Sequence, residues 1–469
     1  MPFEWVFQVP GLSVVSDERG QGDAVELFLG RAAAGGSLPT SEDRKRVAEC
    51  RHFGNEALRL RRAAADAAVR AGDRAGAAMD LARAAELINR GPGLMATRPA
   101  AGQVDELLAQ AWAFGTGDLA AEARTLNAEA YQHADTDPVT AELAERAITL
   151  ARRAGDPLTE SAALDQLTAV RLARGEIRAA AASALLRTDL LVPMPVTAMS
   201  GFEFTDAFVM VAESAIAAGD LRAARVWAEH VRDLPFNGEQ GHLATARLRV
   251  VAALIGDSDE AVTLAERFRE GWERAGRPRT GNLSRGAYAA ATVHGLRGDD
   301  NARAAWLEIV DALATPGRPV SEIHFGEFFD ALLLLHHGLP GQAMQVLATP
   351  PEHFRAWYNG MWRPWYAALW AEAAVLTKHE DGAVRIHRAR LATGDNPIAA
   401  AIVDRAAALA GDRDGLIPAA AALAAAALAA AGCRYQWART LVFIGGQERV
   451  RGQEALAAMG ATPMAWPPG

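Results

Sequence analysis

The feature that most constrains this chain is a short break, Gly-Asp, that returns along most of its length. The pair occurs at residues 72–73, 117–118, 155–156, 219–220, 256–257, 298–299, 394–395 and 411–412. Gly175-Glu176 and Gly338 lie in similar settings. Several successive breaks are about forty residues apart, which is the period of stacked helical hairpins.

The residues of the break explain how it turns the chain. Glycine adopts the left-handed conformation that ends one helix, and an aspartate after it can accept from the first amides of the next. Five residues after the glycine there is often an alanine: Ala77, Ala180, Ala224, Ala261, Ala343 and Ala399. A small side chain there lets the second helix pack closely on the first. Four breaks carry Glu122, Glu160, Arg303 and Leu416 at that position instead, so the repeat is degenerate.

Two segments resemble tetratricopeptide repeats around the turn between their helices, AIAAGDLRAARVWAEHV (215–231) and VVAALIGDSDEAVTLAERF (250–268). The resemblance covers roughly residues 52–450, where apolar residues recur at helical spacing and strand signals are nearly absent. It implies an all-α, tetratricopeptide-like superhelix of hairpins, an α-α solenoid, over residues 51–461. A short irregular segment precedes it, and residues 462–469 are expected to form a flexible tail. A non-repetitive helical bundle with similar turns is the alternative.

The first fifty residues do not fit the repeat. The stretch VFQVPGLSVVSDERGQGDAVELFLGRAAAGG (6–36) has a short β-like run, a Pro-Gly turn, a polar loop and then a helical pattern. This order resembles the segment after the nucleotide-binding core of LuxR-type and AfsR-type signalling ATPases. The matching residues are Val6, Pro10, Leu12, Ala24, Val25, Leu27, Phe28, Arg31 and Ala32. Residues 431–461 resemble the closing helices of the repeat region in the same regulators. Residues 1–50 are therefore interpreted as remnant-like.

This sequence lacks several motifs of those regulators, and their absence limits which properties the resemblance implies for it. The sequence contains no G-x-x-x-x-G-K-[ST] loop, so no backbone cradle for ATP phosphates is expected. The family's Gly-Leu-Pro-Leu turn is absent, and no helix-turn-helix module follows residue 461. No nucleotide-contacting residue can be assigned. The expectation is a chain like the sensor and scaffold half of a regulator, either a shortened relative or a truncated gene.

Charge and composition restrict the partners. A net charge of −9 and an acidic pI argue against a nucleic-acid surface. Cys50 and Cys433 lie far apart, which predicts neither a zinc site nor a disulfide framework. The N-terminus lacks a signal-peptide pattern. The uncharged stretch at 416–433 is mostly alanine and carries Pro418, so a buried helix is favoured over a membrane span. We expect a cytoplasmic protein.

No constellation in the sequence favours catalysis, a cofactor or a metal. The densest histidine cluster contains His324, Glu327, Asp330, His336 and His337, and no second motif completes a metal site. Carboxylates are spread singly along helices near arginines. Pairs such as Glu142 with Arg146 and Glu266 with Arg269 are interpreted as solvated surface.

The stretch AWYNGMWRPWYAALW (356–370) concentrates the aromatic residues. We expect a helix over 349–359, closed by Gly360, and a second helix that Pro364 opens. Trp365 is expected to be structural. Trp357, Tyr358 and Trp362 flank the turn and are the candidate ligand-binding residues, since aromatic rings give large contact area for little entropy loss. Packing of all these rings in the core is the alternative.

The sequence therefore predicts a non-enzymatic sensor or interaction scaffold of a bacterial transcriptional or signalling regulator. A partner protein, a peptide or a small effector would bind in the concave groove. The alternatives are an enzyme of unknown reaction on a helical scaffold and a regulator fragment without independent function. The oligomeric state stays open.

Overall fold

The computed structural model describes residues 54–465 with short gaps. The gaps are residues 92–94, 96, 98, 101, 197–199, 235–240, 280, 315–324, 355–358 and 412–431. Within the described residues every regular element is a helix and no strand occurs. The prediction of an all-α chain is confirmed for this part of the sequence.

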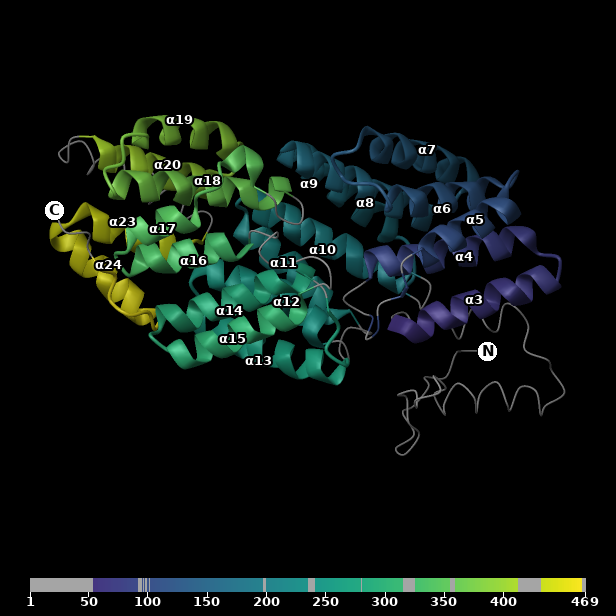
Figure 1. Cartoon of the computed structure of the whole chain (residues 1–469), viewed down its shortest axis with the longest axis horizontal. Helices are drawn as coiled ribbons and strands as arrows, with labels where there is room; N and C mark the ends of the chain where they lie inside the picture. Colours follow the sequence, from purple (N-terminus) through teal and green to yellow (C-terminus); the bar gives the residue numbers. More distant parts are fainter. Residues whose placement is uncertain are drawn as a thin grey trace.

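The helices alternate between an inner and an outer layer (Figure 1). The inner helices are α4 (Arg74–Arg90), α6 (Leu119–Ala130), α8 (Pro157–Arg174), α10 (Gly201–Ala217), α12 (Gly241–Ile255), α14 (Ser284–Leu296), α16 (Phe325–His336), α18 (Asn359–Leu376), α20 (Pro397–Ala410) and α23 (Arg434–Ile444). The outer helices are α3 (Gly54–Arg70), α5 (Gln103–Gly115), α7 (Pro138–Ala154), α9 (Ile177–Leu191), α11 (Leu221–Asp233), α13 (Ser258–Arg274), α15 (Asp300–Leu313), α17 (Pro340–Val346), α19 (Gly382–Thr393) and α24 (Gly446–Ala458).

Packing follows this alternation. Outer helices contact the inner helices beside them in sequence, and inner helices also stack on one another, as α12 does on α14 and α14 on α16. Alanine is frequent in the inner helices, and its small side chain lets helices approach closely. Thus α14 is buried on nearly all sides, whereas α15 buries only Trp306, Val310 and Leu313. The arrangement is that of an α-solenoid.

The turns between helices form as their residues predict. Gly155 has φ 68° and its amide donates to the carbonyls of Ala151 and Arg152, which closes α7. The Asp156 carboxylate accepts from the amides of Leu158 and Thr159, which opens α8. Aspartates cap the following helix in the same way at six breaks: Asp73, Asp118, Asp156, Asp220, Asp257 and Asp299.

The alanine that follows each break is buried at all six positions: Ala77, Ala180, Ala224, Ala261, Ala343 and Ala399. The two layers that the Gly-Asp break joins change their order along the chain. Up to α8 it joins an outer helix to the next inner helix, and from α8 to α17 it joins an inner helix to the next outer one. The break at Gly394 again joins an outer helix, α19, to an inner one, α20. Gly155 and Gly175 flank the single helix α8, so the spacing of the motif is interrupted there.

Two breaks differ from the prediction. At Gly394-Asp395 the capping residue is Asn396, whose side chain accepts from the amide of Ala399, because Pro397 fixes the first helical position. Gly411 has φ −85°, outside the left-handed region, and residue 412 lies outside the described residues.

The aromatic stretch also folds differently from its prediction. Residues 351–353 form only a single turn of 3-10 helix, η4 (Pro351–His353). Helix α18 begins at Asn359, so Pro364 lies inside it instead of opening it. The predicted helix over 349–359 is therefore wrong where the structure describes it.

The C-terminal helices fold back on the middle of the array (Figure 1). Helix α18 contacts α8 and α10, and α23 contacts α12. The Trp365 indole N–H donates to the carbonyl of Ile216 at 3.0 Å, and the Asn396 amide donates to that of Ala217 at 2.9 Å. The Cys433 thiol donates to the carbonyl of Leu254 at 3.2 Å. These groups cover the C-terminal ends of α10 and α12.

The chain after α24 is also held in place. The Thr462 amide donates to the carbonyl of Leu296 at 2.6 Å, and the Ala465 amide donates to that of His336 at 3.0 Å. The Gln453 side chain bonds the backbone of Met464 in both directions. Residues 462–465 are therefore not the flexible tail that we expected, because they close the ends of α14 and α16.

None of the described helices combines the length and apolar character needed to cross a bilayer. Most of the alanine-rich stretch at 416–433 lies outside the described residues.

Candidate functional site

The predicted ligand-binding aromatics do not form an accessible cluster among the described residues. Trp357 and Tyr358 lie outside them. Trp362 is 0 % exposed, and its ring lies 5.4 Å from that of Phe328 and 5.6 Å from that of Phe329. The expectation that Trp362 is reachable from a groove is wrong, because α16 covers it. Trp365, 1 % exposed, is structural as predicted.

The concave groove that we expected is closed in the middle of the array. Helix α18 crosses the inner side and packs directly on α8 and α10. The Trp365 side chain fills this contact. A partner therefore cannot use the inner face at this point without moving α18.

The inner layer of the N-terminal hairpins carries a strip of charged and polar side chains. On α4, Arg83, Glu86 and Arg90 are spaced three and four residues apart, so they share one helix face. Two groups on α6 continue this inner polar strip: Arg124, which donates to Glu86 at 2.9 Å, and Asn127.

The strip ends in a dense acid–arginine cluster that joins helices far apart in sequence. Its members are Arg90, Tyr131, Ser161, Asp165, Arg187, Glu203 and Asp206. Arg187 donates to Asp165 at 2.5 Å, to Glu203 at 2.7 Å and to Asp206 at 2.6 Å. Arg90 donates to Glu203 at 2.9 Å and also binds Asp206. The cluster ties α4 to α8, α9 and α10.

The carboxylates of this cluster differ in their proton affinity. Burial raises the pKa of Asp165 to about 6, with Arg187 opposing and Asp206 adding to the shift. Glu203 is buried too, but Arg90 and Arg187 outweigh its burial and lower its pKa to about 2. Asp165 therefore exchanges its proton near neutral pH while Glu203 stays ionised.

Both hydroxyl groups of the cluster donate hydrogen bonds to its carboxylates. Tyr131 donates to Asp165 at 2.8 Å, and Ser161 donates to Glu203 at 2.8 Å. Burial raises the pKa of Tyr131 well above its usual range. Neither hydroxyl is paired with a histidine base, as an activated nucleophile would require. The arrangement can hold helices together and exchange one proton.

A second arrangement occurs twice along the inner layer, one carboxylate between two arginines. Glu372 of α18 accepts from Arg405 of α20 at 2.9 Å and from Arg439 of α23 at 2.5 Å. Glu213 of α10 accepts from Arg247 of α12 at 3.0 Å and also binds Arg285 of α14. Each unit ties three inner helices together.

Sequence reasoning missed these buried charges, because we interpreted the carboxylates and arginines as solvated surface. The interpretation as solvated surface holds for Glu266 and Arg269, whose side chains are exposed. It is wrong for Glu213 and Glu372, which are buried. A signal was available for Glu372, which is the single charge in the apolar, alanine-rich window 365–377. A lone charge in such a window indicates a buried and paired group.

The histidine cluster does not come together. His324 lies outside the described residues, Asp330 pairs with Arg303 at 2.7 Å, and the His336 ring lies against Tyr435. Burial lowers the pKa of His336 to about 4. In the part of the chain that the structure describes, no group of three or more His, Cys, Asp or Glu side chains could hold a metal ion.

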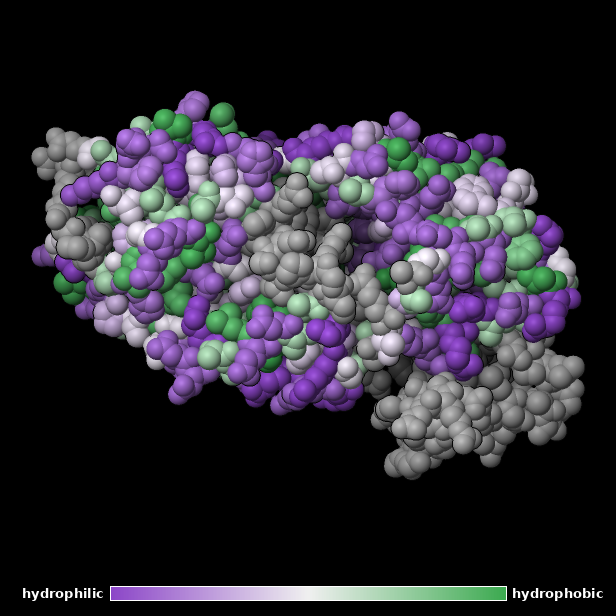
Figure 2. All heavy atoms as spheres, viewed as in Figure 1, coloured by the Kyte–Doolittle hydropathy of each residue, from purple (hydrophilic) through white to green (hydrophobic). Residues whose placement is uncertain are grey.

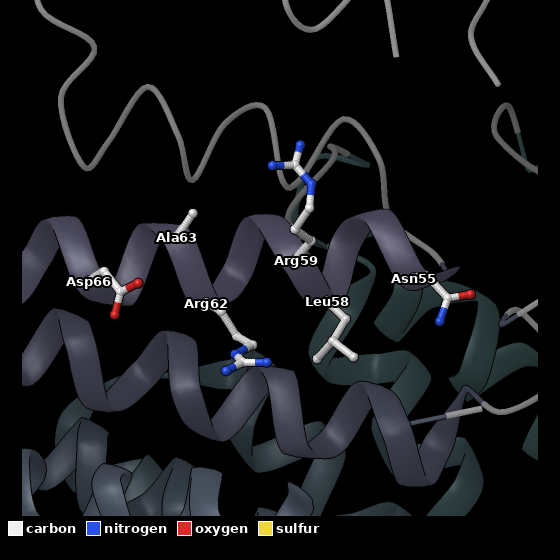
Figure 3. A pocket seen from close by; sticks show the side chains of 6 residues that line it. All are labelled: Asn55, Leu58, Arg59, Arg62, Ala63 and Asp66. Atoms are coloured by element: carbon white, nitrogen blue, oxygen red, sulfur yellow. The ribbon is translucent and has the colours of Figure 1, made fainter. Parts of the chain in front are cut away.

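A shallow depression of about 380 Å³ runs along α3, at the N-terminal end of the described array. It is lined by Asn55, Leu58, Arg59, Arg62, Ala63 and Asp66. In Figure 3, Arg59 and Ala63 point away from the neighbouring helix, whereas Leu58 and Arg62 point toward it. Elsewhere the visible surface is mainly polar, as over α13 and α15 (Figure 2). The depression is open and carries mixed charge, so it suits a contact surface better than a reaction.

The comparisons with known proteins do not assign a family to this chain. No protein-family model matches it, and a search of curated proteins gives no significant match.

Proposed function

We propose that this chain is a non-enzymatic interaction module of a bacterial signalling regulator, a cytoplasmic tetratricopeptide-like superhelix. It would bind a partner protein, a peptide or a small effector on the inner polar strip of its N-terminal hairpins. The observation that carries the proposal is the difference between two parts of the inner face. On α4 and α6 the buried groups Glu86, Arg124 and Asn127 bind one another and leave Arg83 only partly buried beside them. Farther along the array α18 covers the same face.

One residue of the strip is available to a partner. Arg83 is only partly buried and makes no hydrogen bond or ion pair with the described residues. Its surroundings lower its pKa to about 10, through burial first and then through Arg61 and Arg124. A guanidinium in such a place gains from a bound carboxylate or phosphate, which it can contact with two parallel hydrogen bonds. The partner is therefore expected to offer an acidic group.

The rest of the charged inner layer supports a scaffold over an enzyme. Its carboxylates and guanidinium groups bind one another and tie successive hairpins together, as at Glu213 and Glu372. Stacked hairpins commonly present extended surfaces to partners. The resemblance of residues 6–36 and 431–461 to signalling ATPases supports both a role in a regulator and a bacterial origin.

Binding to a defined partner tests the proposal. The proteins encoded beside this chain, above all any with a phosphate-binding loop, are mixed with the purified full-length chain and followed by calorimetry. Arg83→Glu is expected to weaken binding at least ~10-fold, because it places a like charge against the acidic group. The matched control is Arg222→Glu on the exposed side of α11, which should leave affinity unchanged.

Nucleotide binding tests the non-enzymatic part separately. The purified chain is expected to show no saturable heat on titration with ATP, because the sequence holds no phosphate-binding loop. Saturable binding or turnover of ATP would contradict this part. Equal affinity of Arg83→Glu and the wild type for a confirmed partner would contradict the assignment of the inner polar strip.

A further inference from the structure

A buried guanidinium on the inner helix α12 has no acidic partner among the described residues. Arg249 of α12 is 1 % exposed, and its Nε and Nη1 groups have no hydrogen-bond acceptor and no contact with solvent. Within the part of the chain that the structure describes, its hydrogen bond runs from Nη2 to the carbonyl of Leu283 at 3.3 Å. The carboxylate of Glu213 is engaged by Arg247 and Arg285. A buried charge without a counter-ion is strongly unfavourable, so a fold that keeps one needs a reason.

The side chain is held in a defined position. The Phe268 ring lies under the guanidinium, with its centroid 3.4 Å from Cζ. Gly286 also lies against the guanidinium, because an added Cβ there would come within 2.2 Å of the Arg249 Nε. A glycine at this position therefore makes room for the guanidinium. The arrangement holds the charge in place instead of letting it reach solvent.

The guanidinium is aimed at the N-terminus of a helix. Helix α14 begins at Ser284, and its capping residue Leu283 offers no side-chain acceptor to the first amides. The first amides of a helix carry partial positive charge and favour an anion. Burial first, and then the neighbouring Arg247 and Arg285, lower the pKa of Arg249 well below its usual range. The Arg249 guanidinium thus lies at the N-terminus of α14, where its Nη2 group donates to the carbonyl of the capping residue Leu283.

We propose that the N-terminus of α14 and the Arg249 side chain form a binding site for a small oxyanion, a phosphate, sulfate or carboxylate group. The unpaired Nε and Nη1 groups lie on different edges of the guanidinium, so one of them would donate a single charge-assisted hydrogen bond to an oxygen of the anion. The first amides of α14 would donate to the same group. This site is separate from the inner polar strip and does not depend on the proposed partner.

The test compares anion-dependent stability in the purified full-length chain. Melting temperatures are measured in HEPES without added salt and then with inorganic phosphate, sulfate or acetate. The wild type is expected to show a saturable rise of roughly 3 °C or more with at least one of them. Arg249→Met fills the same space without the charge, so it should lose this rise. Without added anions, it should melt at or above the wild-type temperature.

Two further variants keep the test decisive. Arg249→Lys retains the charge on a shorter side chain, without donors at the Nε and Nη1 positions, and should need at least ~10-fold more anion for half of the effect. Arg405→Met removes a buried arginine that Glu372 already pairs, so it should lower the melting temperature and keep the anion response. An equal anion response in the wild type and Arg249→Met would show a general salt effect and overturn the proposal. So would a wild type that responds to none of the three anions.

Discussion

At the scale of single residues, the inner layer shows how this fold buries charge. Glu372 is 0 % exposed and lies between two arginines, while the Gln436 side-chain oxygen Oε1 accepts from both of those arginines at 3.0 Å. Such a unit is costly to break, because removal of one partner leaves an uncompensated charge. The buried ion pairs of the inner layer therefore hold successive hairpins together.

A pH-dependent prediction follows from Asp165. Its pKa is raised to about 6, so the folded state binds this proton more tightly than the unfolded chain does. The contribution of Asp165 to stability therefore grows as pH falls through about 6 and is absent above it. Asp165→Asn should remove this dependence. Relative to the wild type, it should lose about 1 kcal/mol of unfolding free energy between about pH 7 and pH 5, measured by urea titration.

Glu203 provides the control, because its pKa is shifted in the opposite direction from that of Asp165. Its pKa is lowered to about 2, so its stabilisation is present at neutral pH and is lost only as pH falls below the ordinary glutamate range. It does not change between pH 7 and pH 5. An Asp165→Asn curve that runs parallel to the wild-type curve over that range would show that Asp165 is ionised in the fold.

Trp362 gives a second prediction at this scale. Its ring is buried against Phe328 and Phe329, so Trp362→Ala should cost about 3–5 kcal/mol of unfolding free energy. Trp437→Ala is the comparison, since its ring is only partly buried beneath Arg451 and should cost clearly less. Acrylamide quenching of Trp→Phe variants checks the burial directly, and strong quenching of Trp362 would contradict it.

At the scale of elements, each turn depends on which residue caps the helix after it. The break at Gly394 is informative, because two polar residues follow it. The Asn396 side chain accepts from the Ala399 amide and donates to the carbonyl of Ala217, whereas Asp395 pairs with Arg178 on the surface. One residue thus starts α20 and also fixes it to the end of α10.

Alanine substitutions at Asn396 and Asp395 should change the free energy of unfolding by different amounts. Asn396→Ala should cost roughly 2–4 kcal/mol, because it removes a cap and leaves a buried carbonyl without its donor. Asp395→Ala should cost less than about 0.5 kcal/mol, as exposed ion pairs usually do. The measurement is denaturant unfolding of both variants. Equal losses would mean that the cap lies at Asp395, where the sequence pattern first placed it.

At the scale of the whole molecule, the C-terminal part closes the array. Helix α18 packs on α8 and α10, and residues 459–465 follow the turns that end α14 and α16. A core cluster accordingly joins residues as far apart as Leu172 and Met464. This cluster links the hairpins from α8 onward through contacts that are distant in sequence, whereas the N-terminal hairpins have core clusters of their own.

Removal of residues 459–469 tests this closure. The truncated chain should lose amide protection at the ends of α14 and α16, where Leu296 and His336 accept from the removed segment. Hydrogen exchange measures this change, with α4 and α6 as the internal control because they do not touch the segment. Unchanged protection at both ends would show that the segment adds nothing to the closure.

The sequence by itself determined the helices and most of their turns. A glycine, the aspartate beside it and an alanine five residues after the glycine act within a single turn, so local spacing is enough to predict them. The all-α class and the alternation of hairpins follow from the same local pattern.

Only the tertiary structure decided the environment of the functional candidates. Trp362 is buried because α16 covers it, and the inner face is closed because α18 meets α10. Glu372 is buried because arginines from α20 and α23 reach it. These contacts join segments separated by tens to hundreds of residues in the chain. Local spacing shows which face of a helix is apolar, but it does not show which distant helix will cover that face.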